Sequence, residues 1–569
     1  MPIRTSAAAL ASAILFAVTP AVAEENAGAY LAGRQAAVQN DYGAAAEYFT
    51  RALVRDPSNV RLMEDALAAY LGLGDFTRAA PIATRIIQST PSSQLANLVL
   101  LVRDAKSEDW EDLLNNLDAG QSVGPLFDGL VEAWALIGAG RMSEAVDAFD
   151  DVAESGGVEA FGLYHKAVAL ASVGDLESAA ELFSGAAGPQ LRLTRRGVIA
   201  YSEVLSQLDR GADAVDMIDQ AYGDDLDPAL ADLRRQLEAG APVPFTGITS
   251  PVEGVAEVAY SVAGALNGEA ADAYTLIYAR AAEYLDPDQV DAVLLVASLL
   301  DDLGQYDLAT EAFDKVPRDD PSFHAAELGR AEVLRRAGKV DRAVEVLKQL
   351  SETHPDLAIV HTTLGDVLRR DERFAEAKAA YSDAIALFED DQESQWIVYF
   401  ARGIAHERTD DWEAAEADFR KALELRPEQP QVLNYLGYSF VEMDTNLDEA
   451  LDMIERAVAA QPESGYITDS LGWVLYRLGR YDEALVQMER AVELLPVDPV
   501  VNDHLGDVYW AVGRQREAEF QWHRALSFID EGESTDADPE RIRRKLEVGL
   551  DTVLEEEGAP PLRVADDNG

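Results

Sequence analysis

The sequence repeats itself with a period of about 34 residues, and the repetition is clearest between Trp396 and Phe528. When the segments of this stretch are aligned, small residues occupy three columns and proline occupies a fourth. The glycine column holds Gly403, Gly437, Gly472 and Gly506, the two alanine columns hold Ala415, Ala450, Ala484 and Ala518 and then Ala422, Ala457, Ala491 and Ala525, and the proline column holds Pro427, Pro462 and Pro496. A single unit of this length cannot bury its own apolar face, so the units must stack on one another.

The residues of one unit predict two short antiparallel helices, which we call helix A and helix B. On helix B, Ala484, Met488 and Ala491 follow the i, i+4, i+7 spacing of a single helical face. Gly479 supplies a permissive backbone in the turn before this helix. Pro496 ends the helix, because proline cannot continue it. The small residues of the glycine and alanine columns let the two backbones approach closely.

This pattern resembles the tetratricopeptide repeat family, which shares the period, the small residues at fixed columns and the closing proline. The resemblance extends over nearly the whole chain after the first two dozen residues. It implies an all-α fold, namely a right-handed superhelix (an α-solenoid) of roughly a dozen helix-turn-helix repeats. Such a resemblance is specific for the fold and does not identify a partner.

We expect two arms of repeats, residues 24–236 and residues 255–529. Between them lies LEAGAPVPFTGITSPVEG, residues 237–254, which is rich in proline and glycine and has no helical stripe. Beyond this segment the regular spacing resumes with Ala309, Ala343 and Ala377. The sequence therefore predicts a linker at residues 237–254, with the boundary between two superhelical arms there.

A single capping helix is predicted within residues 530–557, followed by a polar, disordered tail at residues 558–569. Asp538, Pro539 and Glu540 are typical of a helix start, with an N-cap, a proline at the first position and an acid in the first turn. Apolar residues then recur every four positions, at Ile542, Leu546, Leu550 and Leu554. This helix is expected to shield the open face of the last repeat.

Residues 1–23 have the features of a secretory signal peptide. Arg4 gives the positive start, Ala7–Val18 is a short apolar run, and Ala21-Val22-Ala23 forms an A-x-A cleavage site. The run is too short to span a bilayer in a mature protein, and an uncleaved N-terminal membrane anchor is the alternative. The chain has no cysteine, which excludes disulfides and the lipobox cysteine of a bacterial lipoprotein. We expect an exported, periplasmic protein with no transmembrane segment in the mature chain.

The formal net charge is −56, from 103 acidic and 47 basic residues. Such an acidic chain is unsuited to nucleic acid, whose phosphates require a basic surface, and to anionic lipid head groups. A basic or neutral protein partner fits better, and its binding should weaken with salt. The alternative is that the charge only keeps a long, apolar-rich array of repeats soluble.

No motif in the sequence carries catalysis, so we expect a protein that is not an enzyme and binds no cofactor. The seven histidines form no H-E-x-x-H pair, and no Walker loop or dinucleotide fingerprint is present. Gly437-Tyr438-Ser439 lacks the second glycine of a nucleophile elbow. The acidic clusters do not match an EF-hand loop, so no metal site is predicted.

The remaining candidate is a partner-binding surface on the concave side, which the A helices of stacked units should line. Aromatic side chains among hydrogen-bonding groups suit a peptide groove, because they offer contact area at low entropy cost. The predicted groove residues are Asn434, Tyr438, Tyr466, Asp469, Trp473, Tyr476, Arg477, Asp503, Asp507 and Trp510. In the alternative, Trp473 and Trp510 pack between adjacent repeats or under the capping helix.

A sharper resemblance lies in the later half, in stretches such as VLNYLGYSF, DSLGWVLYRLGRYDEAL and HLGDVYWAVGR. They resemble a group of exported proteobacterial repeat proteins, one of which is the lipoprotein adaptor of a periplasmic carboxyl-terminal processing protease. The resemblance implies a protein that binds such a protease and presents cell-wall hydrolases to it. The missing lipobox cysteine departs from that pattern, so lipid anchoring does not carry over. An assembly factor for an envelope export or polysaccharide machine is the alternative.

Overall fold

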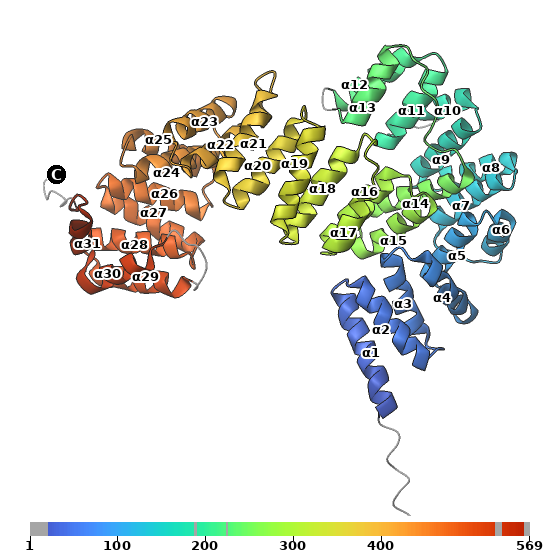
Figure 1. Ribbon diagram of the computed structural model, residues 1–569, viewed down its shortest axis with the longest axis horizontal. Coiled ribbons are helices and arrows are strands. Elements are labelled where there is room, and N and C mark those ends of the chain that lie inside the picture. The colour runs from blue at the N-terminus through green and yellow to red at the C-terminus, as the bar shows by residue number, and fades with distance from the viewer. Residues whose placement is uncertain (1–20, 187–190, 224–225, 530–536, 563–569) are drawn as a thin grey trace, which may run out of the picture. The chain divides into compact units, whose positions relative to one another are not determined.

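The computed structural model describes residues 21–186, 191–223, 226–529 and 537–562 (Figure 1). Within these ranges the chain forms 31 α-helices and one short 3-10 helix, and no β-strand. Within each unit, most helices pack against the next helix in sequence, and the predicted all-α solenoid is confirmed. Residues 1–20 of the predicted signal peptide lie outside the described residues. None of the helices described is both long enough and apolar enough to cross a membrane.

Residue contacts divide the chain into two compact units, which we call unit 1 (Met1–Leu350) and unit 2 (Ser351–Gly569). The helices of unit 1 are α1 (Ala21–Val38), α2 (Tyr42–Arg55), α3 (Val60–Gly72), α4 (Phe76–Ser89), α5 (Gln94–Lys106), α6 (Trp110–Asp118), α7 (Pro125–Gly138), α8 (Met142–Ala153), α9 (Glu159–Ser172), α10 (Leu176–Ser184), α11 (Arg195–Gln207), α12 (Gly211–Tyr222), α13 (Pro228–Glu238), α14 (Pro251–Leu266), α15 (Asp272–Leu285), α16 (Val290–Asp302), α17 (Tyr306–Phe313) and α18 (Phe323–Arg336). The division falls within α19 (Val340–Thr353).

The helices of unit 2 follow the same alternation of A and B. They are α20 (Ala358–Arg370), α21 (Phe374–Ala386), α22 (Trp396–Glu407), α23 (Trp412–Leu425), α24 (Pro430–Glu442), α25 (Leu447–Ala460), α26 (Gly465–Arg477), α27 (Tyr481–Leu494), α28 (Pro499–Ala511), α29 (Gln515–Phe528), α30 (Pro539–Val548) and α31 (Leu550–Glu557), with the 3-10 helix at Glu393–Gln395. The even-numbered helices from α20 to α28 are A helices, and their odd-numbered successors are B helices.

The predicted linker, residues 237–254, lies inside unit 1 and is packed there. Thr246 donates to the Glu203 carboxylate from its backbone amide (3.0 Å) and from its hydroxyl (2.8 Å). Val243 and Ile248 are buried, and α14 already begins at Pro251. The contact division between Leu350 and Ser351 therefore differs from the arm boundary expected at this linker. The difference arises because the segment is anchored by side-chain contacts that its composition does not reveal.

Helices α14 and α15 pack against A helices of the first repeats rather than only against their neighbours in sequence. Helix α14 contacts α5, α7 and α9, and α15 contacts α3 and α5. A Cβ atom on Gly254 would lie 2.2 Å from the Trp134 ring, so only glycine allows α14 to approach α7 this closely. The Tyr284 ring stacks on Phe76, with 4.7 Å between their centroids. The A-helix face of the first repeats is thus covered by helices of the same unit.

In unit 2 the glycine column marks the points where helix A touches a large side chain of helix B. A Cβ atom on Gly403 would lie 2.6 Å from the Phe419 ring, and one on Gly506 would lie 2.4 Å from the Trp522 indole. Cβ atoms in real structures essentially never make contacts shorter than 3.0 Å. The small-residue column is therefore a packing requirement, as predicted.

Replacing Gly506 with alanine is expected to lower the free energy of unfolding by about 1–3 kcal/mol, because the fully buried Trp522 leaves no room for a methyl group. This loss should outweigh the gain of about 1 kcal/mol that alanine brings to a helix interior. Urea unfolding of the full chain measures the difference. The control is Gly264→Ala on α14, where a Cβ atom meets nothing within 4 Å and the helix-forming gain should remain. A destabilisation of both variants alike would contradict the packing explanation.

The C-terminal cap consists of two helices, whereas the sequence predicted one helix. The start is confirmed, because the Asp538 side chain accepts hydrogen bonds from the backbone amides of Glu540 and Arg541. Helix α30 ends at Val548, and Gly549 has a φ of 83°, which interrupts the helix before α31. A Cβ atom on Gly549 would lie 2.6 Å from the Trp510 ring. The chain turns here because it passes directly over that indole. Residues 530–536 and 563–569 lie outside the described residues.

Candidate functional site

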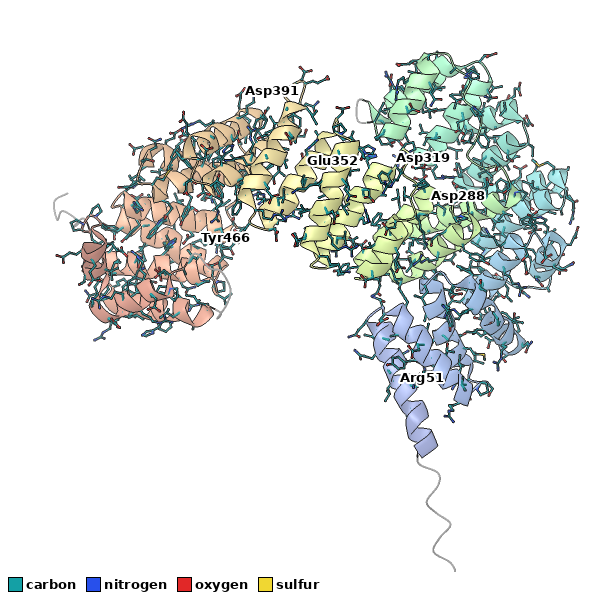
Figure 2. The ribbon with its side chains drawn as sticks, viewed as in Figure 1. Arg51, Asp288, Asp319, Glu352, Asp391 and Tyr466 are labelled. Atoms are coloured by element: carbon teal, nitrogen blue, oxygen red, sulfur yellow. The ribbon has the colours of Figure 1, made fainter. Side chains whose placement is uncertain are left out.

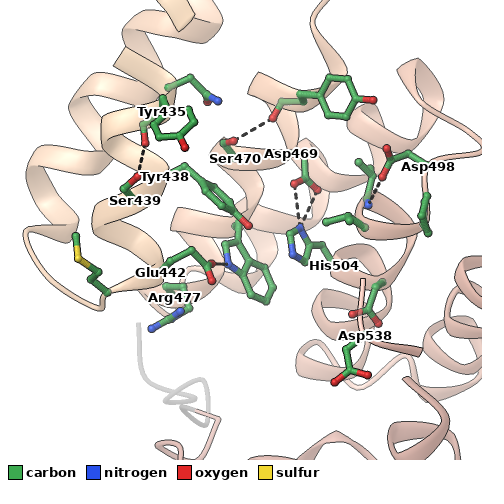
Figure 3. Close-up of a pocket in the computed structure, with 18 of the residues that line it drawn as sticks. Tyr435, Tyr438, Ser439, Glu442, Asp469, Ser470, Arg477, Asp498, His504 and Asp538 are labelled. Atoms are coloured by element: carbon green, nitrogen blue, oxygen red, sulfur yellow. Dashed lines mark hydrogen bonds and ion pairs between the residues drawn. The ribbon is translucent and has the colours of Figure 1, made fainter. Parts of the chain in front are cut away.

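An open groove of about 1010 Å³ lies in unit 2, across the A helices α22, α24, α26 and α28 and the start of α30 (Figure 3). Because helices A of successive repeats stand side by side, residues from successive A helices form one wall, to which Trp412 at the start of the B helix α23 adds. The aromatic side chains of the wall are Trp412, Tyr435, Tyr438, Tyr466 and Trp473. Tyr466 is 61% exposed and is labelled in Figure 2. The groove therefore combines accessible rings with polar groups.

Trp473 lies in this groove and is held in place by two other rings. It stacks on Tyr476 of its own helix, at 4.8 Å between centroids and 10° between planes, and on His504 of α28, at 4.0 Å and 11°. Its indole Nε1 donates to Glu442 Oε1 at 2.9 Å (Figure 3). The ring is thus fixed between adjacent repeats, as in the alternative considered for it, while still lining the groove.

His504 forms a buried pair with Asp469. The Nδ1 atom of the imidazole lies 2.9 Å from Asp469 Oδ2, and both residues are less than a tenth exposed. Burial by itself disfavours the imidazolium, but the charge and hydrogen bond of Asp469, with Asp503 and Asp507 nearby, outweigh it and raise the pKa of His504. Protonated His504 would therefore neutralise one carboxylate of the groove wall.

A second buried network ties the cap to the last repeat. The Lys545 ammonium is completely buried and donates to both carboxylate oxygens of Asp503 at 2.9 Å and to Asp507 Oδ1 at 2.6 Å. The Trp522 indole also donates to Asp507 Oδ1, at 2.9 Å. Burial raises the pKa of Asp503 in spite of the neighbouring ammonium. These charges hold α28, α29 and α30 together.

The structure brings seven of the ten predicted groove residues together in one wall. These are Asn434, Tyr438, Tyr466, Asp469, Trp473, Arg477 and Asp503. Their common lining of one groove supports the assignment of A helices to the concave side. Their role in binding a partner stays a prediction.

The other three predicted residues serve the packing of unit 2. Tyr476 is buried behind Trp473, and Asp507 is 1% exposed and bound to Lys545. Trp510 packs on Trp522, with 5.5 Å between centroids, and its indole donates to Asp551 of α31. The cap therefore covers Trp510, which is the alternative foreseen for it. The column assignment failed here because it took no account of a helix lying against the last repeat.

Sequence reasoning missed Lys545 and His504. Lys545 stands three residues after Ile542 and directly before Leu546, so it falls within the apolar stripe of the capping helix. A lysine in such a stripe is a signal for a buried ion pair. His504 gave no comparable signal, because an isolated histidine on a repeat helix is common.

A smaller cavity of about 410 Å³ lies in unit 1 between α9, α11 and α14. Its walls include Phe161, Tyr164 and Tyr260, and Glu257 lies among them. Glu257 is 2% exposed and accepts hydrogen bonds from the Tyr164 hydroxyl (2.8 Å), from the Arg196 guanidinium (3.0 Å) and from the Gln289 amide (2.8 Å). Burial opposes its ionisation, but Arg196 and Tyr164 prevail and lower the pKa of Glu257. These contacts fasten α14 to its neighbours.

His165 makes the stability of unit 1 depend on pH. It is completely buried, its Nδ1 accepts from the Trp134 indole at 3.2 Å, and burial lowers its pKa from 6.5 to about 4. Between these values the unfolded chain binds a proton that the folded chain does not, so stability falls as the pH is lowered from 6.5 to 4. We expect this group to remove about 3 kcal/mol. Urea unfolding between pH 7 and pH 4 measures it, and His165→Gln should lack this component. Equal acid sensitivity of both proteins would contradict the prediction.

Within the described part of the chain, no group of three or more histidine, aspartate or glutamate side chains is placed to hold a metal ion.

Models of known protein families match the chain in its repeat segments. A family model described as tetratricopeptide repeat matches residues 30–94, 130–191, 294–358 and 444–499, and a second model of the same description matches residues 356–428. Together the matches cover more than half of the chain. The chain belongs to the tetratricopeptide repeat family. Proteins built from these repeats are generally scaffolds that bind other proteins or peptides.

Individual relatives of this tetratricopeptide repeat protein are similar over limited parts. TPR repeat-containing protein PA4667 of Pseudomonas aeruginosa is 28% identical over 159 residues, which are 28% of this chain and 26% of that protein. Human tetratricopeptide repeat protein 13 is 26% identical over 178 residues, which are 30% of this chain and 20% of that protein. The matches thus span about a quarter and a fifth of these relatives' lengths.

Among solved structures, the APC/C hetero-tetramer Cut9–Hcn1 aligns with 92% of this chain and 96% of its own chain. The sequence identity is 16% and the TM-score is 0.37. A similarity at this level says nothing about what the present tetratricopeptide repeat protein binds.

Proposed function

We propose that this protein is a non-catalytic scaffold that binds a segment of a protein partner in the groove of unit 2. The observation that carries the proposal is the groove itself, a wall of A helices that combines aromatic side chains, among them the exposed Tyr466, with polar side chains. Rigid aromatic side chains give contact area at low entropy cost, and the polar groups between them orient the bound chain. In unit 1 the A-helix face of the first repeats is covered by α14 and α15, so that face is not offered to a partner.

The finer proposal is a periplasmic adaptor that presents cell-wall hydrolases to a carboxyl-terminal processing protease. Two features of the sequence support it: the signal-like first 23 residues and the resemblance of the later half to exported proteobacterial repeat proteins. The groove lies in that later half. An assembly factor for an envelope export or polysaccharide machine would use the same groove and the same signal.

Tyr466 provides the test of the groove, because it is 61% exposed and its substitution removes no buried contact of the fold. We expect Tyr466→Ala to weaken binding of a groove partner by about 1–2 kcal/mol, roughly tenfold. The matched control is Phe520→Ala on helix α29, since Phe520 is also 61% exposed but does not line the groove. Both variants should unfold at the same urea concentration as the parent protein.

The measurement is capture from an envelope extract with the full chain and both variants as bait, followed by mass spectrometry and by titration of each recovered protein. A carboxyl-terminal processing protease together with cell-wall hydrolases, lost with Tyr466→Ala and kept with Phe520→Ala, would support the adaptor. Export or polysaccharide components with the same dependence would support the assembly factor. Partners that bind both variants equally would contradict the proposal that binding takes place in the groove.

A further inference from the structure

The cations that line the groove of unit 2 are already neutralised within the fold. Each of the three arginines in the wall lies beside a carboxylate, and the pairs are Arg408–Glu407 (3.7 Å), Arg477–Asp444 (3.1 Å) and Arg541–Glu557 (2.8 Å). A guanidinium held by its own carboxylate attracts an incoming anion weakly, because the pair carries little net charge. The groove therefore offers few free positive charges to a ligand.

Three carboxylates of the same wall have no cationic partner among the described residues. Within the described part of the chain Glu442 accepts from the Trp473 indole, and Asp498 and Asp538 accept backbone amides at the starts of α28 and α30. These hydrogen bonds fix the carboxylates without cancelling their charge. The wall thus keeps an uncompensated negative charge at three places along one groove.

Another acceptor in the wall has no hydrogen-bond donor in the part of the chain that the structure describes. The side-chain oxygen Oδ1 of Asn434 is buried and accepts no hydrogen bond within the described chain. A buried acceptor without a donor costs free energy, and a ligand that supplies an N–H group removes that cost. Asn434 therefore favours a ligand rich in donors, as the carboxylates do.

We propose that the groove of unit 2 binds a basic segment of a partner protein, an extended stretch whose lysine or arginine side chains meet Glu442, Asp498 and Asp538. The ring of Tyr466 stands beside Asp498, whose charge is the main cause of the raised pKa of the tyrosine. A cation placed there meets a carboxylate and an exposed aromatic side chain together, and both attract it. An acidic segment would bring like charges together and would be repelled. This inference rests on the proposed function, since it names the chemistry of the partner that the groove holds.

The test uses the full chain and three twelve-residue probe peptides of equal length with one fluorophore, in which alanine alternates with lysine, serine or glutamate. A triple variant, Glu442→Gln, Asp498→Asn and Asp538→Asn, removes the three charges while amide oxygens keep the hydrogen bonds, and asparagine remains a good N-cap. The control triple variant is Glu455→Gln, Asp482→Asn and Glu519→Gln, which removes three exposed charges from the B helices α25, α27 and α29. This control corrects for the general attraction between a lysine peptide and a chain of net charge −56.

Fluorescence anisotropy should show that the lysine peptide binds and that the groove variant weakens it by about tenfold or more, whereas the control variant changes it less than about twofold. Equal weakening by both triple variants, or preferred binding of the serine or glutamate peptide, would overturn the inference. A different result would contradict the proposed function, namely that partners recovered from the envelope bind Tyr466→Ala as tightly as the parent protein. If a partner requires Tyr466 but binds the groove variant as well as the parent protein, the proposed scaffold function holds. The inference that the bound segment is basic would then be wrong.

Discussion

Replacing Lys545 with methionine is expected to lower the free energy of unfolding of unit 2 by about 3–5 kcal/mol. Methionine nearly fills the space of the lysine stem, but it leaves the carboxylates of Asp503 and Asp507 buried without their shared cation. Both groups would then have to be protonated or reach water, and either change loosens α30 from α28. The loss should therefore begin at the C-terminal cap.

Urea unfolding of the full chain gives the size of this effect, and hydrogen exchange shows where it acts. Faster exchange should appear in α28, α29 and α30 and not in unit 1. Arg543→Met serves as the control, because Arg543 lies on the same helix, is exposed and, among the residues described, pairs with Glu540 on its own helix. That substitution should change stability by less than about 0.5 kcal/mol. A Lys545→Met protein as stable as the control would show that the buried ions do not hold the cap.

Replacing Glu257 with leucine is expected to destabilise unit 1 by about 3–5 kcal/mol. The carboxylate receives donors from α9, α11 and the start of α16, so its loss leaves the Tyr164 hydroxyl, the Gln289 amide and part of the Arg196 guanidinium without acceptors. Arg196 would retain Asp291 at 3.0 Å, which limits the damage to one side of the guanidinium. Helix α14 should then separate from the helices it covers.

Hydrogen exchange along α9, α11 and α14 and urea unfolding together measure this effect. Glu269→Leu is the matched control, since it removes the same charge from an exposed position just beyond α14. Faster exchange confined to unit 1 is the expected result. An unchanged exchange rate in α14 would mean that apolar contacts such as that between Gly254 and Trp134 suffice to hold the helix.

The fold could be predicted from the sequence because each repeat is specified locally. Gly506 faces Trp522 within a single helix pair, and the small residue with its large partner recurs about 34 residues apart along the chain. What the repeat pattern omits is contact between distant repeats. Nothing in residues 237–254 shows that Thr246 meets Glu203, or that Gly254 lies against Trp134, because these pairings depend on where the array returns upon itself.

The candidate site was predictable to the extent that helix position determines exposure. Tyr438 and Tyr466 lie on the A helices α24 and α26, at positions that the repeat pattern assigns to the concave side, and both line the groove. The prediction failed for Asp507 and Trp510. The repeat pattern also assigns them to the groove side of an A helix, but they lie in the last repeat, where α30 and α31 pack against them. The end of an array differs from its middle, and a periodic argument cannot register that difference.

The covering of the first repeats by α14 and α15 affects the order in which the chain can fold. A growing or translocating chain emerges with its N-terminus first, so α3, α5 and α7 appear long before Pro251–Leu285. Until then the surfaces around Phe76, Phe127 and Trp134 remain open to water, although they are buried in the finished unit. A chain that stops short of Pro251 keeps this apolar face bare and should depend on chaperones or aggregate. The apolar face of the first repeats can therefore be buried only after α14 and α15, which lie much later in the sequence, have been made.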